Sequence, residues 1–181
     1  MDDEMILLET EEKMEKTIKA YKNELVNIRT GRANPSMLDR VMVDYYGSPT
    51  PLNQISGISV VEGRQLLVKP YDKSSMKDIE RAVYEADLGL TPQNDGAVIR
   101  INIPPLTEER RKELVKQVKK LAEEAKIAIR NQRRKANDLV EKDEDEDAVK
   151  EGKKDIQKLT DKFIQEIDDI TKDKESDLMT V

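Results

Sequence analysis

The residues of this sequence best suited to chemistry are basic side chains gathered in one segment. Residues 107–137 carry eleven Lys or Arg against five Asp or Glu, a local net charge of +6 in a chain whose net charge is −6. Four of them are spaced i, i+4, i+7 and i+8 and so lie along one side of a helix: Lys126, Arg130, Arg133 and Arg134. A guanidinium group binds phosphate oxygens bidentately and stacks on exposed bases, which suits this face to folded RNA.

The same residues also fit a second interpretation, a solvated helix face paired with an acidic neighbour. Residues 138–181 carry sixteen Asp or Glu against eight Lys or Arg, and surface charge runs are commonly paired in this way. The basic run, which begins at Arg110, lies between acidic segments, and Arg29 and Arg32 add guanidinium groups where an earlier helix ends. From the residues alone, RNA binding and structural pairing remain equally open.

Catalysis finds little support among the remaining residues. The chain has no His and no Cys, which removes Ser-His-Asp and Cys-His arrangements and nearly every zinc, copper or haem site. The carboxylates of Asp168 and Asp169 diverge on a helix, and Asp143–Asp147 lacks the spacing of an EF-hand. No glycine-rich nucleotide motif is present. We therefore expect a binding protein that is not an enzyme and has no cofactor or metal; any use of GTP would belong to a partner.

The composition favours long amphipathic helices over a thick globular core. Charged residues make up 39% of the chain and aromatic residues 3%. The amino terminus is acidic, and no window approaches the ~20 apolar residues of a membrane span. We expect a cytoplasmic protein with no membrane partner.

Residues 7–28 have the narrow seam of a long amphipathic helix, with apolar residues spaced seven, four, three, four and three apart. Glycine readily adopts the left-handed conformation that ends helices, so this helix should end at Thr30-Gly31. Pro35 then prevents the chain from re-entering the helix.

Helical periodicity returns after Thr107, a good N-cap residue, and continues to Leu139. The acidic stretch Glu141–Asp147 and Gly152 interrupt the pattern. A third helix follows over 156–178. The second and third helices are therefore expected to be consecutive in the chain.

Between the first two helices the pattern predicts a small module of mixed structure. Residues 41–45 and 98–103 are expected to be strands, and 47–51 is rich in the residues that form turns. Ser75 can cap a short helix that Gly89 would end. The module is thus of the α+β type.

The expected fold class is α+β, an elongated three-helix bundle with an inserted small domain, together L-shaped. Residues 1–30 and 105–181 form the bundle, and 31–104 form the inserted domain. The chain crosses between them twice, at 31–35 and 104–106, and both crossings meet the same end of the bundle. The two crossings are expected to act as a paired hinge of Gly31, Arg32, Pro35, Pro104, Pro105 and Leu106.

Four sequence blocks resemble the ribosome recycling factor family of bacterial type. The blocks are NIRTGRANPSMLDRV, VDYYGSPTPLNQI, ADLGLTPQNDGAVIRINIPPLTEERRKEL and AIRNQRRKAND. Their order and spacing extend the resemblance over essentially the whole chain. The resemblance implies an L-shaped protein of tRNA-like dimensions, with a long three-helix domain and a small β/α/β domain joined by a flexible hinge.

The resemblance also implies a function in protein biosynthesis. Family members bind the post-termination ribosome across its subunit interface and, with elongation factor G and GTP, split it into subunits. Arg133 resembles the family's central arginine for large-subunit rRNA, and Arg130 lies beside it. Arg29 and Arg32 match the arginines of the TGRA block, and Arg110 matches the first arginine of TEERRK.

Two features depart from the family pattern. Lys135 stands where the family commonly has an acidic residue, and the connection Glu141–Lys154 is several residues shorter than usual. The resemblance therefore does not specify the contacts made near these positions.

A protein of another class could also have three amphipathic seams. In a coiled-coil scaffold or a chaperone-like interaction protein, the seams would pair with helices of a partner. Sedimentation separates the two, since a dimer assembled through these helices favours the scaffold. A monomer with an intact bundle, which we expect, favours the recycling factor.

Overall fold

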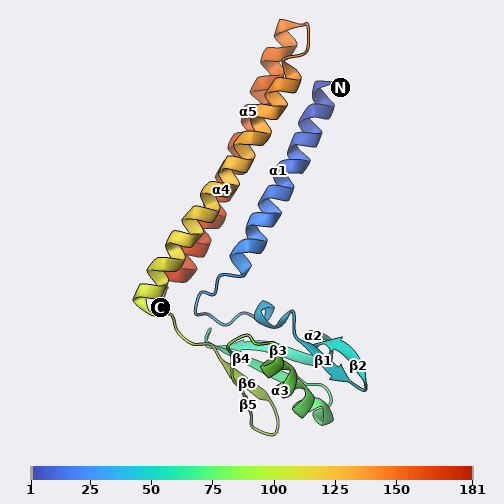
Figure 1. Ribbon diagram of the computed structural model, residues 1–181, viewed down its shortest axis with the longest axis vertical. Helices are drawn as coiled ribbons and strands as arrows, with labels where there is room; N and C mark the ends of the chain where they lie inside the picture. The colour runs from blue at the N-terminus through green and yellow to red at the C-terminus, as the bar shows by residue number, and fades with distance from the viewer. Residues whose placement is uncertain (1, 181) are drawn as a thin grey trace. The chain divides into compact units, whose positions relative to one another are not determined.

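The computed structural model describes residues 2–180, which divide into two compact units (Figure 1). One unit contains the chain up to Arg29 and from Thr107 onward, and the other is Thr30–Leu106. Each unit has an apolar core of its own. All six residues expected in the hinge, from Gly31 to Leu106, belong to the second unit.

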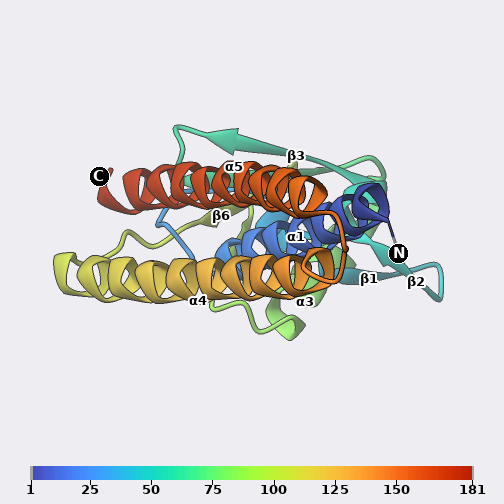
Figure 2. The same cartoon turned by 90° about the horizontal axis from the view of Figure 1, so that it is seen from above.

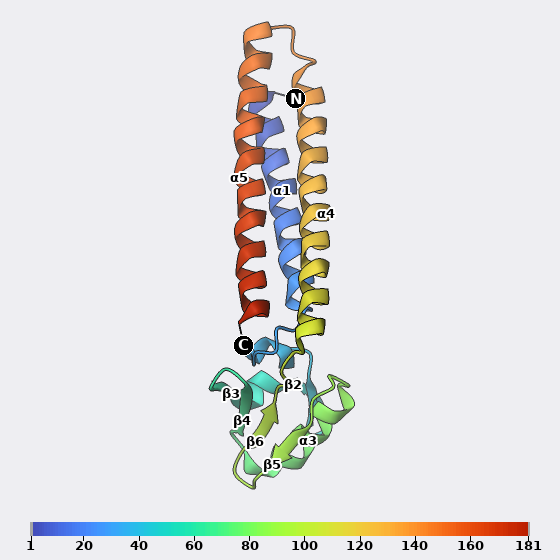
Figure 3. The ribbon, with the colours of Figure 1, turned by 90° about the vertical axis from the view of Figure 1, so that its left-hand side faces the viewer.

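Long helices make up the first unit (Figure 3). They are α1 (Asp3–Val26), α4 (Glu108–Val140) and α5 (Glu146–Met179), and α4 runs in the opposite direction to α1 and α5. Each follows a residue whose side chain accepts a hydrogen bond from a backbone N–H of the first turn: Asp2, Thr107 and Asp145. The N-cap predicted at Thr107 is confirmed. Among residues 2–180, no helix has an apolar stretch long enough to cross a membrane.

The seams of these helices are buried within the unit itself. The seam of α1 consists of Ile6, Thr10, Met14, Ile18, Tyr21 and Leu25. Helices α4 and α5 bury similar stripes and run alongside each other from a short connection at one end (Figure 2). Hydrogen bonds also connect the helices: Tyr21 Oη lies 2.6 Å from Thr171 Oγ1, and Gln132 Nε2 donates to Thr17 Oγ1 over 2.9 Å. Burial raises the pKa of Tyr21.

The bounds of α1 differ from those expected at both ends. The helix begins at Asp3, because Asp2 caps it, and not at Leu7. It ends at Val26, so the predicted end at Thr30-Gly31 is wrong. Gly31 does have a left-handed conformation, with φ of +76°, but it lies five residues beyond the helix.

Gly152 lies inside α5, so the prediction that it interrupts the helical pattern is wrong. A Cβ atom at this position would lie 2.7 Å from Cγ1 of Val140, the last residue of α4. Both residues are buried. Glycine at this position therefore lets α5 approach α4 closely. The packing gained in this way offsets the low helix propensity of glycine.

An antiparallel sheet and a short helix form the second unit. The strand order is β3-β4-β6-β5, with bounds Ser56–Val61 (β3), Gln65–Pro70 (β4), Ile99–Asn102 (β6) and Pro92–Asn94 (β5). Helix α3 (Met76–Glu85) contributes Ile79 and Val83 to the core that the sheet forms with Leu66 and Ile101. The remaining elements are the hairpin β1 (Met42–Tyr45) and β2 (Ser48–Pro51), α2 (Leu52–Ile55) and two 3-10 helices, η1 (Pro35–Leu38) and η2 (Lys73–Ser75).

The local signals in this unit were only partly correct. Residues 47–51, predicted as a turn, include strand β2, and the turn itself is at Tyr46-Gly47. Ser75 precedes α3 but does not cap it, because its hydroxyl donates to the backbone oxygen of Asp72. The helix ends at Glu85, and the left-handed residue Asp87 follows, so Gly89 does not end it.

The Gly152 contact leads to a prediction about stability. Gly152→Ala is expected to lower the free energy of unfolding by about 1 kcal/mol, because overpacking of 1–3 kcal/mol outweighs a gain of about 1 kcal/mol in helix propensity. Urea denaturation of both proteins measures the difference. In a Val140→Ala background the same change should become neutral or stabilising, since the clash is gone. Stabilisation of the otherwise unchanged chain would contradict the prediction.

Candidate nucleic-acid interface

The four central basic residues lie on one flank of α4, beside the stripe that the bundle buries. At about 100° per residue, burial of Ile129 places Arg133 next to the core stripe and Arg130 and Arg134 further round the helix. The structure agrees with this order, because Arg130 and Arg133 are half-buried and Arg134 is exposed. Their apolar stems therefore cover the edge of the seam while their guanidinium groups reach outward.

Lys126 is the member of this group that pairs with the acidic third helix. Its Nζ lies 2.5 Å from Asp168 Oδ1 on α5, and its side chain is only 21% exposed. This contact joins α4 and α5 across the edge of their interface. Pairing with an acidic helix, the second interpretation of the basic face, is therefore correct for Lys126.

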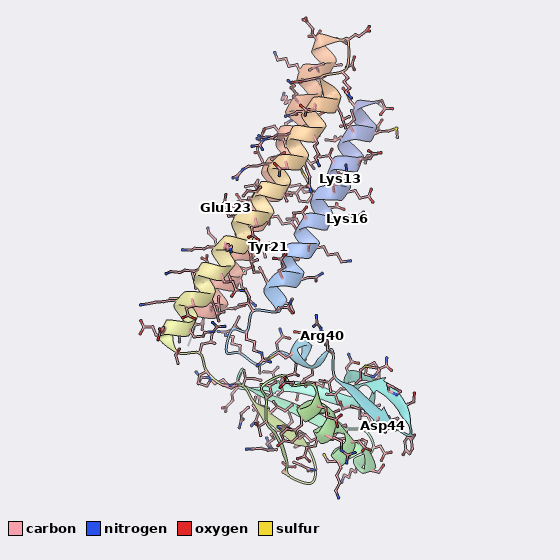
Figure 4. All side chains as sticks on the ribbon, viewed as in Figure 1. Lys13, Lys16, Tyr21, Arg40, Asp44 and Glu123 are labelled. Atoms are coloured by element: carbon pink, nitrogen blue, oxygen red, sulfur yellow. The ribbon has the colours of Figure 1, made fainter. Side chains whose placement is uncertain are left out.

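The three arginines beside Lys126 make different contacts. Arg130 Nη1 lies 3.3 Å from Glu123 Oε1, seven residues earlier on the same helix (Glu123 is labelled in Figure 4). Arg134 Nη1 donates to Asn131 Oδ1 over 3.1 Å. Within residues 2–180, no ion pair or hydrogen bond is formed by the side chain of Arg133, and none of the three pairs with α5. The guanidinium groups of Arg130, Arg133 and Arg134, on one flank of α4, are therefore not paired with the acidic helix α5.

The other predicted RNA-binding residues do not join this group. Arg110, in the first turn of α4, pairs with Glu113 over 3.0 Å and is about 30 Å along the helix from Arg130. Arg29 is exposed just beyond the end of α1, at the same end of the bundle as the start of α4 (Figure 1). Arg32 is exposed in the second unit. The candidate site is therefore Arg130, Arg133 and Arg134, with Lys126 at its edge.

Sequence reasoning missed the residues that hold this face in place. Nothing in the sequence around Asp168 indicates a structural role, yet its carboxylate pairs with Lys126. Thr17 gave no signal, although it accepts the hydrogen bond that positions Gln132, the neighbour of Arg133. Both contacts lie between helices distant in the sequence. In residues 2–180, no cluster of three or more carboxylates is arranged to hold a metal ion.

The fold and the site together define a helical-bundle protein with an inserted α+β unit and a cationic helix face. The family model described as ribosome recycling factor matches residues 21–179. Ribosome-recycling factors of Bacillus subtilis (strain 168) and Brevibacillus brevis are 58% and 55% identical to the chain, each over 97% of this chain and 98% of the relative. The chain belongs to the ribosome recycling factor family, a family of translation factors.

Two solved structures resemble the chain over nearly its whole length. A solution structure of the ribosome recycling factor is 42% identical, with a TM-score of 0.83, and the match covers 100% of this chain and 99% of that one. The second is described as models for the T. thermophilus ribosome recycling factor and the E. coli elongation factor G bound to the E. coli post-termination complex. It is also 42% identical, covers 99% of this chain and 100% of that chain, and has a TM-score of 0.68.

The contacts of Lys126 and Arg134 predict different effects on stability. Lys126→Met, which keeps the apolar stem, should lower the free energy of unfolding by about 1 kcal/mol, because it removes the pair with Asp168. Arg134→Met, a change of the same charge on the same helix, should stay within about 0.5 kcal/mol. Urea denaturation measures both. If both variants lose the same free energy of unfolding, the pair of Lys126 with Asp168 does not contribute to stability.

Proposed function

We propose that this protein binds the post-termination ribosome and, together with elongation factor G and GTP, separates it into subunits. Its membership of the ribosome recycling factor family supports this, as does the similar T. thermophilus factor described with elongation factor G on the post-termination complex. The protein acts in the cytoplasm as a monomer. It catalyses no covalent step, and GTP is hydrolysed by its partner.

The observation that carries the proposal is the set of three arginines on α4 that α5 does not neutralise. Arg130, Arg133 and Arg134 contact rRNA of the large subunit, with Arg133 at the centre because its guanidinium group has no partner among residues 2–180. Lys126 supports the face through its pair with Asp168. Arg29, Arg32 and Arg110 are additional contacts with RNA. The burial of all three seams within the unit favours this function over a scaffold that would need a free seam.

Replacement of Arg133 tests the proposal. Arg133→Ala is expected to weaken ribosome binding about tenfold to a hundredfold, because one charge-assisted contact contributes about 1.5–3 kcal/mol. Binding is measured by co-sedimentation with ribosomes at several salt concentrations, and the slope of log affinity against log salt should fall by about one. Helical content and the midpoint of thermal unfolding should not change.

Lys120→Ala is the matched control, since it removes one positive charge from an exposed site on the same helix. It should leave ribosome binding nearly unchanged. If Arg133→Ala and Lys120→Ala weaken binding equally, the effect comes from net charge, and the arginine face is not the contact surface.

The two chain crossings are proposed to act as a hinge, on which splitting of the ribosome depends. Both crossings come together in the second unit, where a Cβ atom on Gly31 would lie 3.3 Å from the backbone nitrogen and from Cγ of Leu106. With φ of +76°, Gly31 also has a conformation that other residues adopt only with strain. Gly31 and Leu106, one from each crossing, thus approach each other closely.

Gly31→Ala should therefore impair splitting more than binding. We expect it to slow subunit separation by elongation factor G and GTP, measured by light scattering, while ribosome affinity stays within about twofold. The matched control is Gly63→Ala, which has similar strain at φ of +71° but no atom within 4 Å of the added Cβ. Equal splitting rates in the two variants would contradict a role for the Gly31–Leu106 contact.

A further inference from the structure

A cavity in the second unit lies between the β1–β2 hairpin and the start of α3. Its volume is about 240 Å³, and it is lined by Asp44, Tyr45, Tyr46, Gly47, Ser74, Ser75 and Asp78. Asp44, on the hairpin, is labelled in Figure 4. A hollow of this size has room for the end of a long side chain. Neither the arginine face nor the hinge includes any of these residues.

The cavity is lined by negative charge and by no positive charge. Asp44 and Asp78 approach it from different elements, and neither forms an ion pair or side-chain hydrogen bond within residues 2–180. The N-terminal end of a helix attracts anions, but Asp78 already lies in the first turn of α3, and the Asp72 carboxylate caps η2 just before it. The Asp78 carboxylate therefore opposes a second anion at this end of α3, and the charges of the residues that line the cavity favour a cation.

An aromatic wall beside these carboxylates is held in an unusual position. Tyr46 has φ of +52° and is 78% exposed, although a left-handed conformation is uncommon for a bulky residue. Its hydroxyl donates to Asp72 Oδ2 over 2.7 Å, which holds the pKa of that carboxyl below its usual range. The ring of Tyr45 meets that of Tyr46 edge-on, with centroids 4.6 Å apart. The Tyr46 ring is thus held exposed at the rim of the cavity, and the Tyr45 ring beside it is partly buried against the core of the unit.

We propose that this cavity receives a lysine or arginine side chain from the surface of a protein partner. The two carboxylates would bind the cationic group, and the tyrosine rings would pack on it through cation–π contact. The phosphates of RNA would be repelled by Asp44, Asp72 and Asp78, so the partner at this surface is a protein. This site is separate from the arginine face, and its test does not depend on the function proposed for that face.

Titration of the ¹⁵N-labelled full chain with N-acetyl-arginine amide tests the proposal by NMR. Saturable shifts are expected for the backbone amides of Gly47 and Ser74, with an affinity in the millimolar range, as is usual for a single weak contact. N-acetyl-citrulline amide has nearly the same shape without the charge, and it should bind about tenfold more weakly or not at all. Equal binding of the two compounds would overturn the proposal.

Variants locate the binding site within the unit. Asp44→Asn and Asp78→Asn, tested singly and together, should each weaken binding of N-acetyl-arginine amide by several-fold to about tenfold. Asp39→Asn and Glu85→Gln make the same charge change at exposed positions outside the cavity and should have little effect. The NMR spectrum shows whether each variant is folded. If Asp78→Asn disturbs α3, Asp44→Asn by itself still tests whether the cavity carboxylates bind N-acetyl-arginine amide. Equal losses in cavity and control variants would mean that only net charge matters and would overturn the proposal.

Discussion

The arginine face depends on the burial of one stripe of α4. Because a helix turns about 100° per residue, burial of Val118, Ile129 and Ala136 fixes the rotation of α4 about its own axis. Every other side chain of the helix then has a set direction. Arg130, Arg133 and Arg134 lie on the flank of the stripe because the core lies where it does. A change that rotated α4 in the bundle would move all three guanidinium groups together.

Two contacts along the α4–α5 pair keep that rotation fixed. Gly152 allows α5 to approach Val140 at the end where the two helices connect. Further along, the pair of Lys126 with Asp168 closes the edge of the same interface. The contact at Gly152 depends on the absence of a side chain, and the contact between Lys126 and Asp168 depends on charge. Both hold the arginine flank of α4 in place beside α5.

Features that depend on local periodicity could be predicted from the sequence. The three helices and the N-cap at Thr107 follow from apolar spacing and side-chain chemistry within a few residues. Gly152 could not be read correctly, because its role depends on Val140, a residue of another helix. Ser75 failed as a cap for a similar reason, since its hydroxyl has a partner, the backbone of Asp72, that competes with the helix. For the site, the sequence indicated which arginines share a face, but only the structure separates Lys126 from the other three.

In the proposed function, the separation of charge along the chain makes RNA binding by the arginine face selective. A segment with a net charge of +6 in isolation would bind any polyanion, since contacts with phosphates carry no sequence information. In this chain the segment is followed by residues 138–181, which carry sixteen acidic against eight basic residues, and the whole protein has a net charge of −6. This net charge opposes long-range attraction of nucleic acid, so in the proposed function the arginines contribute only where RNA reaches their flank of α4 within about a Debye length, ~8 Å. The acidic residues of α5 thus do not pair with Arg130, Arg133 or Arg134, and in the proposed function their charge opposes binding to RNA that does not fit this flank of α4.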